Sequence, residues 1–311
     1  MTESLKGRDL LTLADLSSGE VTAVLDLAIV QKQEWAEGVR SRPLDGRAIA
    51  LVFEKPSVRT RVSFEVACAR LGATPVVLSG SGSAFSRGET VADTAHVLER
   101  YCDAIVLRTF EQARLDEVAE VASVPVVNSL SDDHHPCQGL ADLLTIREHL
   151  GTLQGLTFAY VGDGNNMAHT YLHAGALTGM DVRIATPAGF EPSAEIVAEA
   201  QTIARTTGAT ITVTADPREA VAGADVVATD TWASMGQEGE HAARLAAFEP
   251  FRVHSGLMAL AADAAVFLHC LPAHRGEEVT DEVIDAPYSV VFDEAENRLH
   301  AQKALLTLLL G

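Results

Sequence analysis

The sequence predicts an α/β protein of two domains, each built on a mainly parallel sheet flanked by helices and joined by interdomain helices. Short apolar runs alternate with helical patterns along the chain, which is typical of parallel sheets covered by helices on both faces. The length of 311 residues also exceeds the usual size of a single domain. A helical pattern near the middle, residues 139–150, is interpreted as the link between two α/β halves.

Apolar runs predict the strands of the first domain at residues 48–53, 75–78, 104–107 and 124–127. The first run, Ala48-Ile49-Ala50-Leu51-Val52-Phe53, has no polar residue, as expected for a parallel strand buried on both faces. It leads into a helical segment, residues 62–71, that ends at Gly72. We place the first domain at residues 1–138 and expect a C-terminal helix, residues 296–311, to pack back on it.

Further runs predict the strands of the second domain at residues 156–161, 182–185, 209–213, 224–228 and 265–268. A shorter run, Ser289-Val290-Val291-Phe292, is expected to add a strand near the end. The linking helix has apolar residues at Leu140, Leu143, Leu144 and Leu150, opposite a charged face. The second domain, residues 139–295, includes this helix.

Bulk composition restricts the class of partner. A formal net charge of −20 argues against nucleic acid and anionic membranes as partners. No apolar run reaches the length of a membrane span, and the first residues lack the apolar core of a signal peptide. Four cysteines in a chain of this length do not make a disulfide framework, so we expect a cytoplasmic protein.

Hydroxyl and guanidinium groups meet at one predicted helix N-terminus. The segment Ser57-Val58-Arg59-Thr60-Arg61 follows the first strand directly and precedes the first helix of the sheet. Unpaired backbone N–H groups at such a terminus, with arginines beside them, suit a phosphate. Taken alone, the segment is also compatible with an ordinary N-capping serine and two solvated arginines.

Polar residues follow other predicted strands as well. Ligands of open α/β sheets bind beyond the carboxyl ends of the strands, so these residues are candidates for one site. Three of these residues could instead have a purely structural role: Arg108 as a surface cation, Cys270 as a small buried residue and Asp230 as a helix N-cap. The polar segments are Arg108 and residues 131–138, 162–166, 230–236 and 269–272.

Two segments resemble other kinds of site. His134, His135 and Cys137 are metal-ligand residue types, but they lack a second ligand pair at recognised spacing, so we expect no metal. The segment Gly162-Asp163-Gly164-Asn165-Asn166 begins like a dinucleotide fingerprint, but Met167 stands in place of the third glycine. An NAD-linked dehydrogenase is the alternative enzyme class that this segment suggests.

Motifs in a fixed order extend over nearly the whole chain: Ser57-Val58-Arg59-Thr60-Arg61, His135-Pro136-Cys137-Gln138, Asp230-Thr231-Trp232-Ala233-Ser234-Met235-Gly236, His269-Cys270-Leu271-Pro272 and Glu294-Ala295-Glu296-Asn297-Arg298. Together they resemble the aspartate/ornithine carbamoyltransferase superfamily, and within it most closely the ornithine carbamoyltransferases. The resemblance implies transfer of the carbamoyl group of carbamoyl phosphate to the δ-amine of L-ornithine, giving L-citrulline and phosphate in arginine metabolism. It implies direct attack by the neutral amine, with no covalent enzyme intermediate, no cofactor and no metal. It also implies a homotrimer, or an assembly of trimers, with active sites at subunit interfaces.

The resemblance further implies roles for individual residues. Residues that would hold carbamoyl phosphate are Ser57, Val58, Arg59, Thr60, Arg108, His135, Gln138, Cys270, Leu271 and Arg298. Those that would hold ornithine are Asn166, Asp230, Ser234 and Met235. The residues expected to act in catalysis are Arg108, His135, Asp230 and Cys270.

Two positions depart from the family pattern. Val58 stands where a threonine is usual, so we expect weaker phosphate binding. Ala84, in the loop of residues 79–90, stands where a Gln or His usually reaches into the neighbouring subunit, and Ser83, Ser86 or Arg87 could take its place. The alternatives left open are a transcarbamoylase for another amine, such as putrescine or an acylated ornithine, and a non-catalytic sensor of carbamoyl phosphate.

Overall fold

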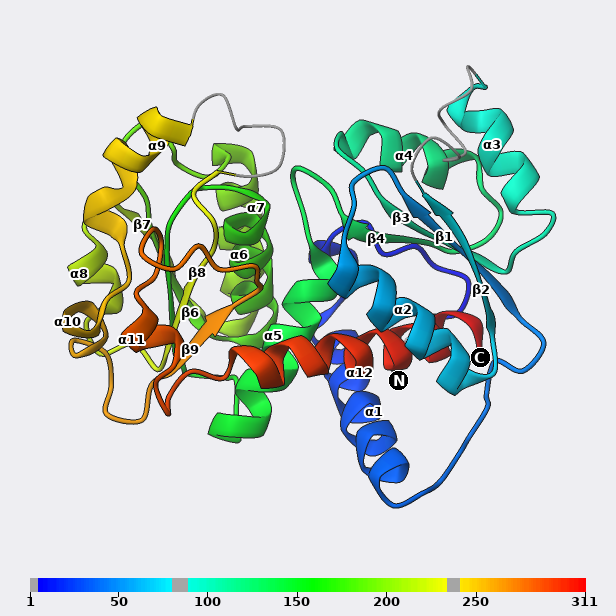
Figure 1. Cartoon of the computed structure of the whole chain (residues 1–311), viewed down its shortest axis with the longest axis horizontal. Helices are drawn as coiled ribbons and strands as arrows, with labels where there is room; N and C mark the ends of the chain where they lie inside the picture. Colours follow the sequence, from blue (N-terminus) through cyan, green and yellow to red (C-terminus); the bar gives the residue numbers. More distant parts are fainter. Residues whose placement is uncertain (1–4, 80–88, 234–240) are drawn as a thin grey trace. The chain divides into compact units, whose positions relative to one another are not determined.

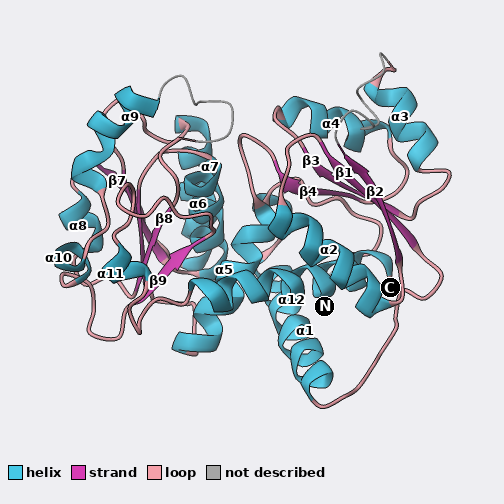
Figure 2. Ribbon diagram, viewed as in Figure 1, coloured by secondary structure: helices cyan, strands magenta, loops and turns pink. Residues whose placement is uncertain are grey.

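The computed structural model describes residues 5–79, 89–233 and 241–311 (Figures 1 and 2). The chain divides into two compact units, and each is an α/β structure with one parallel sheet. The first unit comprises Met1–Leu144 and Glu296–Gly311, and the second comprises Thr145–Ala295. The chain leaves the first unit within helix α5 (Pro136–Leu150) and returns to it within helix α12 (Val291–Leu310).

The sheet of the first unit has the strand order β2-β1-β3-β4, and all its pairs are parallel. Its strands are β1 (Ala48–Phe53), β2 (Thr74–Ser79), β3 (Ala104–Arg108) and β4 (Val126–Leu130). Its other helices are the short 3-10 helix η1 (Leu13–Asp15), α1 (Ser18–Ala36), α2 (Val58–Leu71), α3 (Val91–Leu98) and α4 (Gln112–Val121).

Helices cover both faces of this sheet. Ala50 and Val52 of β1 pack with Leu98 of α3 and Leu115 of α4 in one buried cluster. Helix α2 packs against β1 and β2 from the opposite side of the sheet (Figure 1). Because both faces are buried, the fully apolar sequence of β1 is explained.

The sheet of the second unit has the order β7-β6-β5-β8-β9 and is also parallel. Its strands are β5 (Thr157–Val161), β6 (Asp181–Ala185), β7 (Ile211–Thr214), β8 (Val226–Thr229) and β9 (Val266–His269). Its helices are α6 (Asn166–Thr178), α7 (Ala194–Thr207), α8 (Pro217–Val221), α9 (His241–Phe248), the 3-10 helix η5 (Glu249–Phe251), α10 (Ser255–Met258) and α11 (Asp281–Ile284).

One predicted strand is wrong. The run 289–292 makes only an isolated bridge, in which the N–H of Val290 donates to the carbonyl of Phe267 at 3.0 Å. Helix α12 begins at Val291, so the remainder of the apolar run is helical, with Val291 buried and Phe292 exposed. A short apolar run does not by itself distinguish a strand from a helix start.

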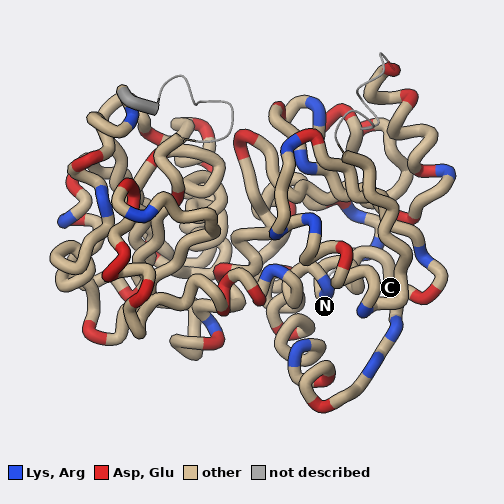
Figure 3. The backbone as a smooth tube through the Cα atoms, in the orientation of Figure 1, with Lys and Arg blue, Asp and Glu red and all other residues tan. Residues whose placement is uncertain are grey.

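None of the described helices is both long and apolar enough to cross a membrane. Acidic and basic residues are interspersed along the backbone of each unit (Figure 3). A local cluster of like charges therefore differs from this background and marks a candidate binding site.

Candidate active site

Each sheet has a point where the strand order reverses, and ligands of open α/β sheets bind in the crevice there. In the first sheet this point lies between β1 and β3, and in the second it lies between β5 and β8. The candidate residues follow these strands in both units. Residues 57–60 come after β1 and Arg108 ends β3, while residues 162–166 come after β5 and Asp230 comes after β8.

The N-terminus of α2 is built as an anion site. Ser57 is its N-cap, and the Ser57 hydroxyl accepts a hydrogen bond from the N–H of Thr60 at 3.3 Å. The first turn of α2 holds no acidic residue, so its positive end is not neutralised from within the helix. Arg61 of the same motif pairs with Glu65 at 2.7 Å on the surface. The side chain of Val58 is 78% exposed.

The hydroxyl of Thr60 is the meeting point of this site. Thr60 is fully buried, and its Oγ1 accepts from Arg298 Nη2 at 2.8 Å and from Arg108 Nη1 at 3.5 Å. The Ser57 hydroxyl lies 3.1 Å from the same atom. Arg108 and Arg298 come from β3 and α12 and are both buried, so two cations converge on one hydroxyl next to a helix N-terminus. An anion placed there would relieve the repulsion between them.

His135 adds a neutral donor to this group of cations. It is buried and directly precedes α5. Burial lowers the pKa of His135 well below 6.5, and Arg298, Arg108 and Arg59 lower it further. The imidazole is therefore uncharged near neutral pH and can donate one N–H without adding charge.

Gln138, in the first turn of α5, is fully buried. Its Nε2 donates to Asp142 Oδ1 at 2.7 Å, which fixes the orientation of the amide. The structure thus brings Ser57, Thr60, Arg108 and Arg298 together through hydrogen bonds at the Thr60 hydroxyl, and it places Gln138 on the helix that His135 precedes.

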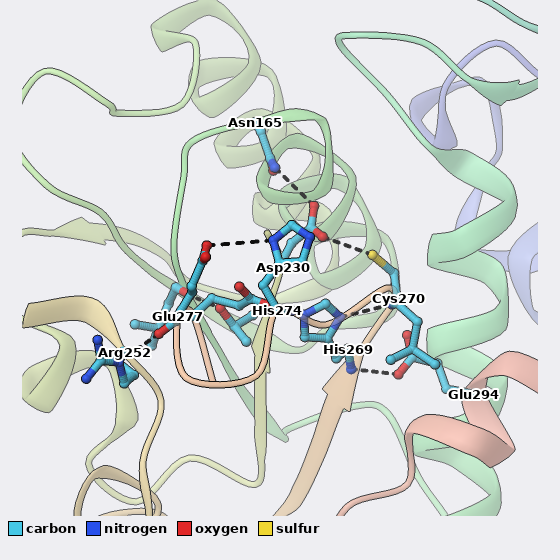
Figure 4. A network of polar contacts seen from close by, with 12 residues as sticks. Asn165, Asp230, Arg252, His269, Cys270, His274, Glu277 and Glu294 are labelled. Atoms are coloured by element: carbon cyan, nitrogen blue, oxygen red, sulfur yellow. Dashed lines mark hydrogen bonds and ion pairs between the residues drawn. The ribbon is translucent and has the colours of Figure 1, made fainter. Parts of the chain in front are cut away.

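Asp230 is the centre of the polar group in the second unit (Figure 4). Its Oδ2 accepts from Asn165 Nδ2 at 3.1 Å, and its Oδ1 accepts from the Cys270 thiol at 3.2 Å. Asn165 caps α6 through the N–H groups of Met167 and Ala168, and it accepts from the Tyr160 hydroxyl at 3.3 Å. Asn166 is the first residue of that helix.

The turn after β9 is held in an unusual backbone conformation. Leu271 has φ of 57°, in the left-handed region that a branched side chain rarely adopts. Its N–H donates to His269 Nδ1 at 2.9 Å, while the N–H of His269 donates to Glu294 at 2.8 Å (Figure 4). His269 Nε2 lies 3.1 Å from Glu278, and both side chains are fully buried. Such strained positions cluster at functional sites.

Asp230, His269 and Cys270 offer metal-ligand atoms within 4.8 Å of one another. These atoms already have protein partners, since both ring nitrogens of His269 are engaged and the thiol donates to Asp230. In a second group, His274, Glu277 and Glu278, the possible ligand atoms also lie within 4.8 Å of one another, and His274 is exposed. Hydrogen bonding accounts for the first group without a cation.

Sequence reasoning did not single out three contributors to the polar site of the second unit. Asp163 and Arg244 form a buried ion pair, and Arg244 Nε also donates to the carbonyl of Trp232 at 2.5 Å. Asp163 was visible only as part of a glycine-containing turn, and no sequence signal pointed to Arg244. Asn165 was likewise noted for its segment and not for its contact with Asp230.

Several predicted residues lie outside the described part of the chain. These are Ser234 and Met235 of the ornithine set and, in the 79–90 loop, Ser83, Ala84, Ser86 and Arg87. Their predicted roles stay predictions.

Comparison with known proteins defines the class. Residues 8–148 match the carbamoyl-P binding domain of the aspartate/ornithine carbamoyltransferases, and residues 154–309 match the Asp/Orn binding domain. The chain therefore belongs to the aspartate/ornithine carbamoyltransferase family.

Similar proteins of known name narrow the class further. The ornithine carbamoyltransferase of Anoxybacillus flavithermus is 55% identical over 309 residues, covering 99% of this chain and 98% of its own. That of Clavibacter sepedonicus is 58% identical over 299 residues, covering 95% and 96%. The solved ornithine carbamoyltransferase of Pyrococcus furiosus superposes with a TM-score of 0.96 at 50% identity, covering 99% and 98%. The sequence-based prediction of family and fold is confirmed.

Proposed function

We propose that the protein transfers the carbamoyl group of carbamoyl phosphate to the δ-amine of L-ornithine, giving L-citrulline and phosphate. The observation that carries this proposal is the convergence of Arg108 and Arg298 on the Thr60 hydroxyl at the N-terminus of α2. Family membership and the identity to ornithine carbamoyltransferases support the same reaction.

The first unit is proposed to hold carbamoyl phosphate. The phosphate would bind the N–H groups at the start of α2, including that of Val58, together with the Ser57 and Thr60 hydroxyls and Arg59. Arg298 completes the positive surroundings. A phosphate leaving group gains charge as the bond to the carbamoyl carbon breaks, and guanidinium groups already in place stabilise it.

Attack on the carbamoyl carbon builds negative charge on its oxygen. Arg108 and neutral His135 are the donors proposed for this oxygen, and each such donor is typically worth roughly 3 kcal/mol. Gln138, Cys270 and Leu271 are assigned to the carbamoyl amide. Because the phosphate is the leaving group and arginines supply the charge, we propose that the reaction requires no cofactor.

The second unit is proposed to hold ornithine. Asp230 is the carboxylate that orients the substrate's ammonium, with Asn166, Ser234 and Met235 as further contacts. The attacking δ-amine must be neutral, although a free amine of this kind has a pKa of about 10.4. Desolvation of the buried amine favours its neutral form, and holding both substrates in line supplies much of the remaining acceleration.

A homotrimer, or an assembly of trimers, with active sites at subunit interfaces is proposed from family likeness. A cytoplasmic location is proposed as well, since all four cysteines are free.

Citrulline formation tests the proposed function directly. Purified protein is incubated with carbamoyl phosphate and, in separate arms, L-ornithine, putrescine or N-acetylornithine. We expect turnover with ornithine and at most traces with the others. Turnover with another amine and none with ornithine would show that the other amine is the acceptor. Binding of carbamoyl phosphate without turnover in any arm would favour the non-catalytic sensor.

A further inference from the structure

A buried arginine outside the proposed roles lies beside the acceptor group. Arg244 of α9 is only 5% exposed. Its guanidinium forms an ion pair with the Asp163 carboxylate, and its Nε donates to the carbonyl of Trp232 at 2.5 Å. Burying a charge is unfavourable unless it is paired and hydrogen-bonded, so this geometry is demanding to maintain.

The two partners of Arg244 flank the residues that meet at Asp230. Asp163 lies two positions before Asn165, whose amide donates to Asp230 at 3.1 Å. Trp232 lies two positions after Asp230. The Arg244 guanidinium therefore holds two segments, one that follows β5 and one that follows β8. The Asn165–Asp230 hydrogen bond joins the same two segments.

Aromatic packing holds the guanidinium in place. Its central carbon lies 4.9 Å from the Phe190 ring centroid and 5.4 Å from that of Phe248. The Trp232 ring stacks on Phe248 with centroids 5.8 Å apart. A lysine would retain the charge, but it could not reproduce the planar fork that contacts a carboxylate and a carbonyl at once.

The segment after β5 is also closely packed. The N–H of Gly164 donates to the carbonyl of Phe190 at 2.9 Å. A Cβ at Gly164 would approach the backbone nitrogen of Pro192 to 2.3 Å, so only glycine fits. Residues 163–165 thus lie against the same segment that supplies Phe190 to Arg244, and a shift of the guanidinium would be passed to Asn165.

The charges around Asp163 explain why an arginine is needed. Burial raises the pKa of Asp163 to about 6; Arg244 opposes this rise, and Asp230 adds to it. Tyr160, which also faces this region, is held neutral because burial raises its pKa, and the Cys270 thiol donates to Asp230 at 3.2 Å. Without Arg244, the Asp163 carboxyl would lie near that of Asp230 and would lose the cation that pairs with it.

We propose that Arg244, through Asp163 and the Trp232 carbonyl, is a positioning residue that sets the geometry of the ornithine site at Asn165 and Asp230. The proposal rests on the proposed function, because ornithine affinity is its readout. Arg244 is assigned no contact with either substrate, since its guanidinium is engaged by Asp163 and the Trp232 carbonyl. Its loss should weaken ornithine binding while leaving carbamoyl phosphate binding in place.

Steady-state kinetics of Arg244→Gln, Arg244→Lys and Asp163→Asn test this assignment. We expect the KM for ornithine to rise by roughly 10- to 100-fold in Arg244→Gln, as for loss of a hydrogen-bonded charge, and by less in Arg244→Lys. The KM for carbamoyl phosphate, measured at saturating ornithine, should stay within about twofold of the parent, since its proposed site uses other residues. In Asp163→Asn/Arg244→Gln, the rise in ornithine KM should be smaller than the product of the single effects, because neither charge is left alone.

Arg183→Gln is the matched control. Arg183 also joins chain segments of the second unit, donating to the carbonyl of Ala222 at 2.8 Å, but it belongs to β6, whereas Asp230 follows β8. Its loss should lower the melting temperature and leave the KM for ornithine unchanged.

An ornithine KM within twofold of the parent in folded Arg244→Gln, or an equal rise in both KM values, would overturn the proposal. If Arg244→Gln does not fold, the two KM values of Arg244→Lys and Asp163→Asn are compared with the parent in the same way, and an unchanged ornithine KM in both would overturn the proposal. Failure of the parent to make citrulline would instead reject the proposed function, so the two failures are distinguishable.

Discussion

The two units place opposite chemistry at the same position of the same kind of sheet. In the first unit the point of strand reversal gathers Arg108, Arg298 and a helix N-terminus, with a neutral His135 among them. In the second it gathers Asp163 and Asp230, with a thiol that donates to one of them. The comparison shows that the sheet decides where a ligand binds, whereas a few residues after the strands decide its charge. The first group suits an anion and the second suits an ammonium.

Removing a central cation should break the first site most severely. Arg108→Gln is expected to lower kcat by roughly 100- to 1000-fold, the usual effect of losing a donor to a developing oxyanion. Arg114→Gln is the control, because Arg114 is engaged with Glu54. A loss of less than fivefold in single-turnover rate at saturating substrates would remove Arg108 from this role.

Removing the central anion should break the second site. Asp230→Asn is expected to raise the KM for ornithine by at least about 30-fold, since one partner of a charged contact is lost. The KM for carbamoyl phosphate should change far less. Asp216→Asn, which alters an exposed helix cap, serves as the control. Equal weakening of both substrates would contradict the division between the units.

Two arginines of one motif allow the donor site to be tested more finely. Arg59→Ala should raise the KM for carbamoyl phosphate and lower kcat, each by about tenfold, because the phosphate is held throughout and gains charge as it leaves. Arg61→Ala should have little effect, since Arg61 already pairs with Glu65. If the two variants behave alike, the assignment of Arg59 is refuted.

The charge state of His135 predicts a pH dependence. Its pKa is lowered well below 6.5 in the folded state, so the ring stays neutral between pH 6 and 8. His135→Gln should therefore reduce the rate without changing the shape of the pH profile of kcat/KM for carbamoyl phosphate. As the pH falls below 6.5, the unfolded state binds a proton that the folded state does not, so His135 lowers stability on the acid side. Chemical denaturation of both proteins at pH 5 and 8 measures this, and a destabilisation by His135 at the higher pH alone would contradict it.

The smallest effect is expected at Val58. Its side chain is 78% exposed, and its proposed contact is made by the backbone. Val58→Thr should therefore change the KM for carbamoyl phosphate by less than about twofold, within the roughly 0.5 kcal/mol typical of surface substitutions. A tenfold improvement would show that the usual threonine hydroxyl contributes directly to binding.

Features set by local pattern could be predicted from the sequence. The strands β1 and β3 and the residues that follow them were identified because apolar runs end in polar segments. The linking helix, predicted at residues 139–150, is α5 and begins three residues earlier at Pro136, since proline favours the first turn of a helix.

Features that depend on tertiary contact were not predictable. The Thr60–Arg298 hydrogen bond joins residues 238 positions apart, and nothing local marks the pair. The contact of Asp163 with Arg244 spans 81 positions, and neither neighbouring sequence suggests the other. The strand predicted at 289–292 was wrong for a local reason, because the apolar pattern of this run fits both a strand and the buried start of α12.

The burial of the cysteines has a practical consequence for labelling. Burial raises the pKa of Cys68 and Cys137 to about 12, and it also raises that of Cys102. Cys270 is the one cysteine of the four that is not buried, and its thiol touches Asp230. Because alkylating reagents attack accessible thiolates, a fluorescent maleimide should mark the natural protein first at Cys270. The chain thus carries a built-in attachment point for a reporter next to the carboxylate that is proposed to orient the amine.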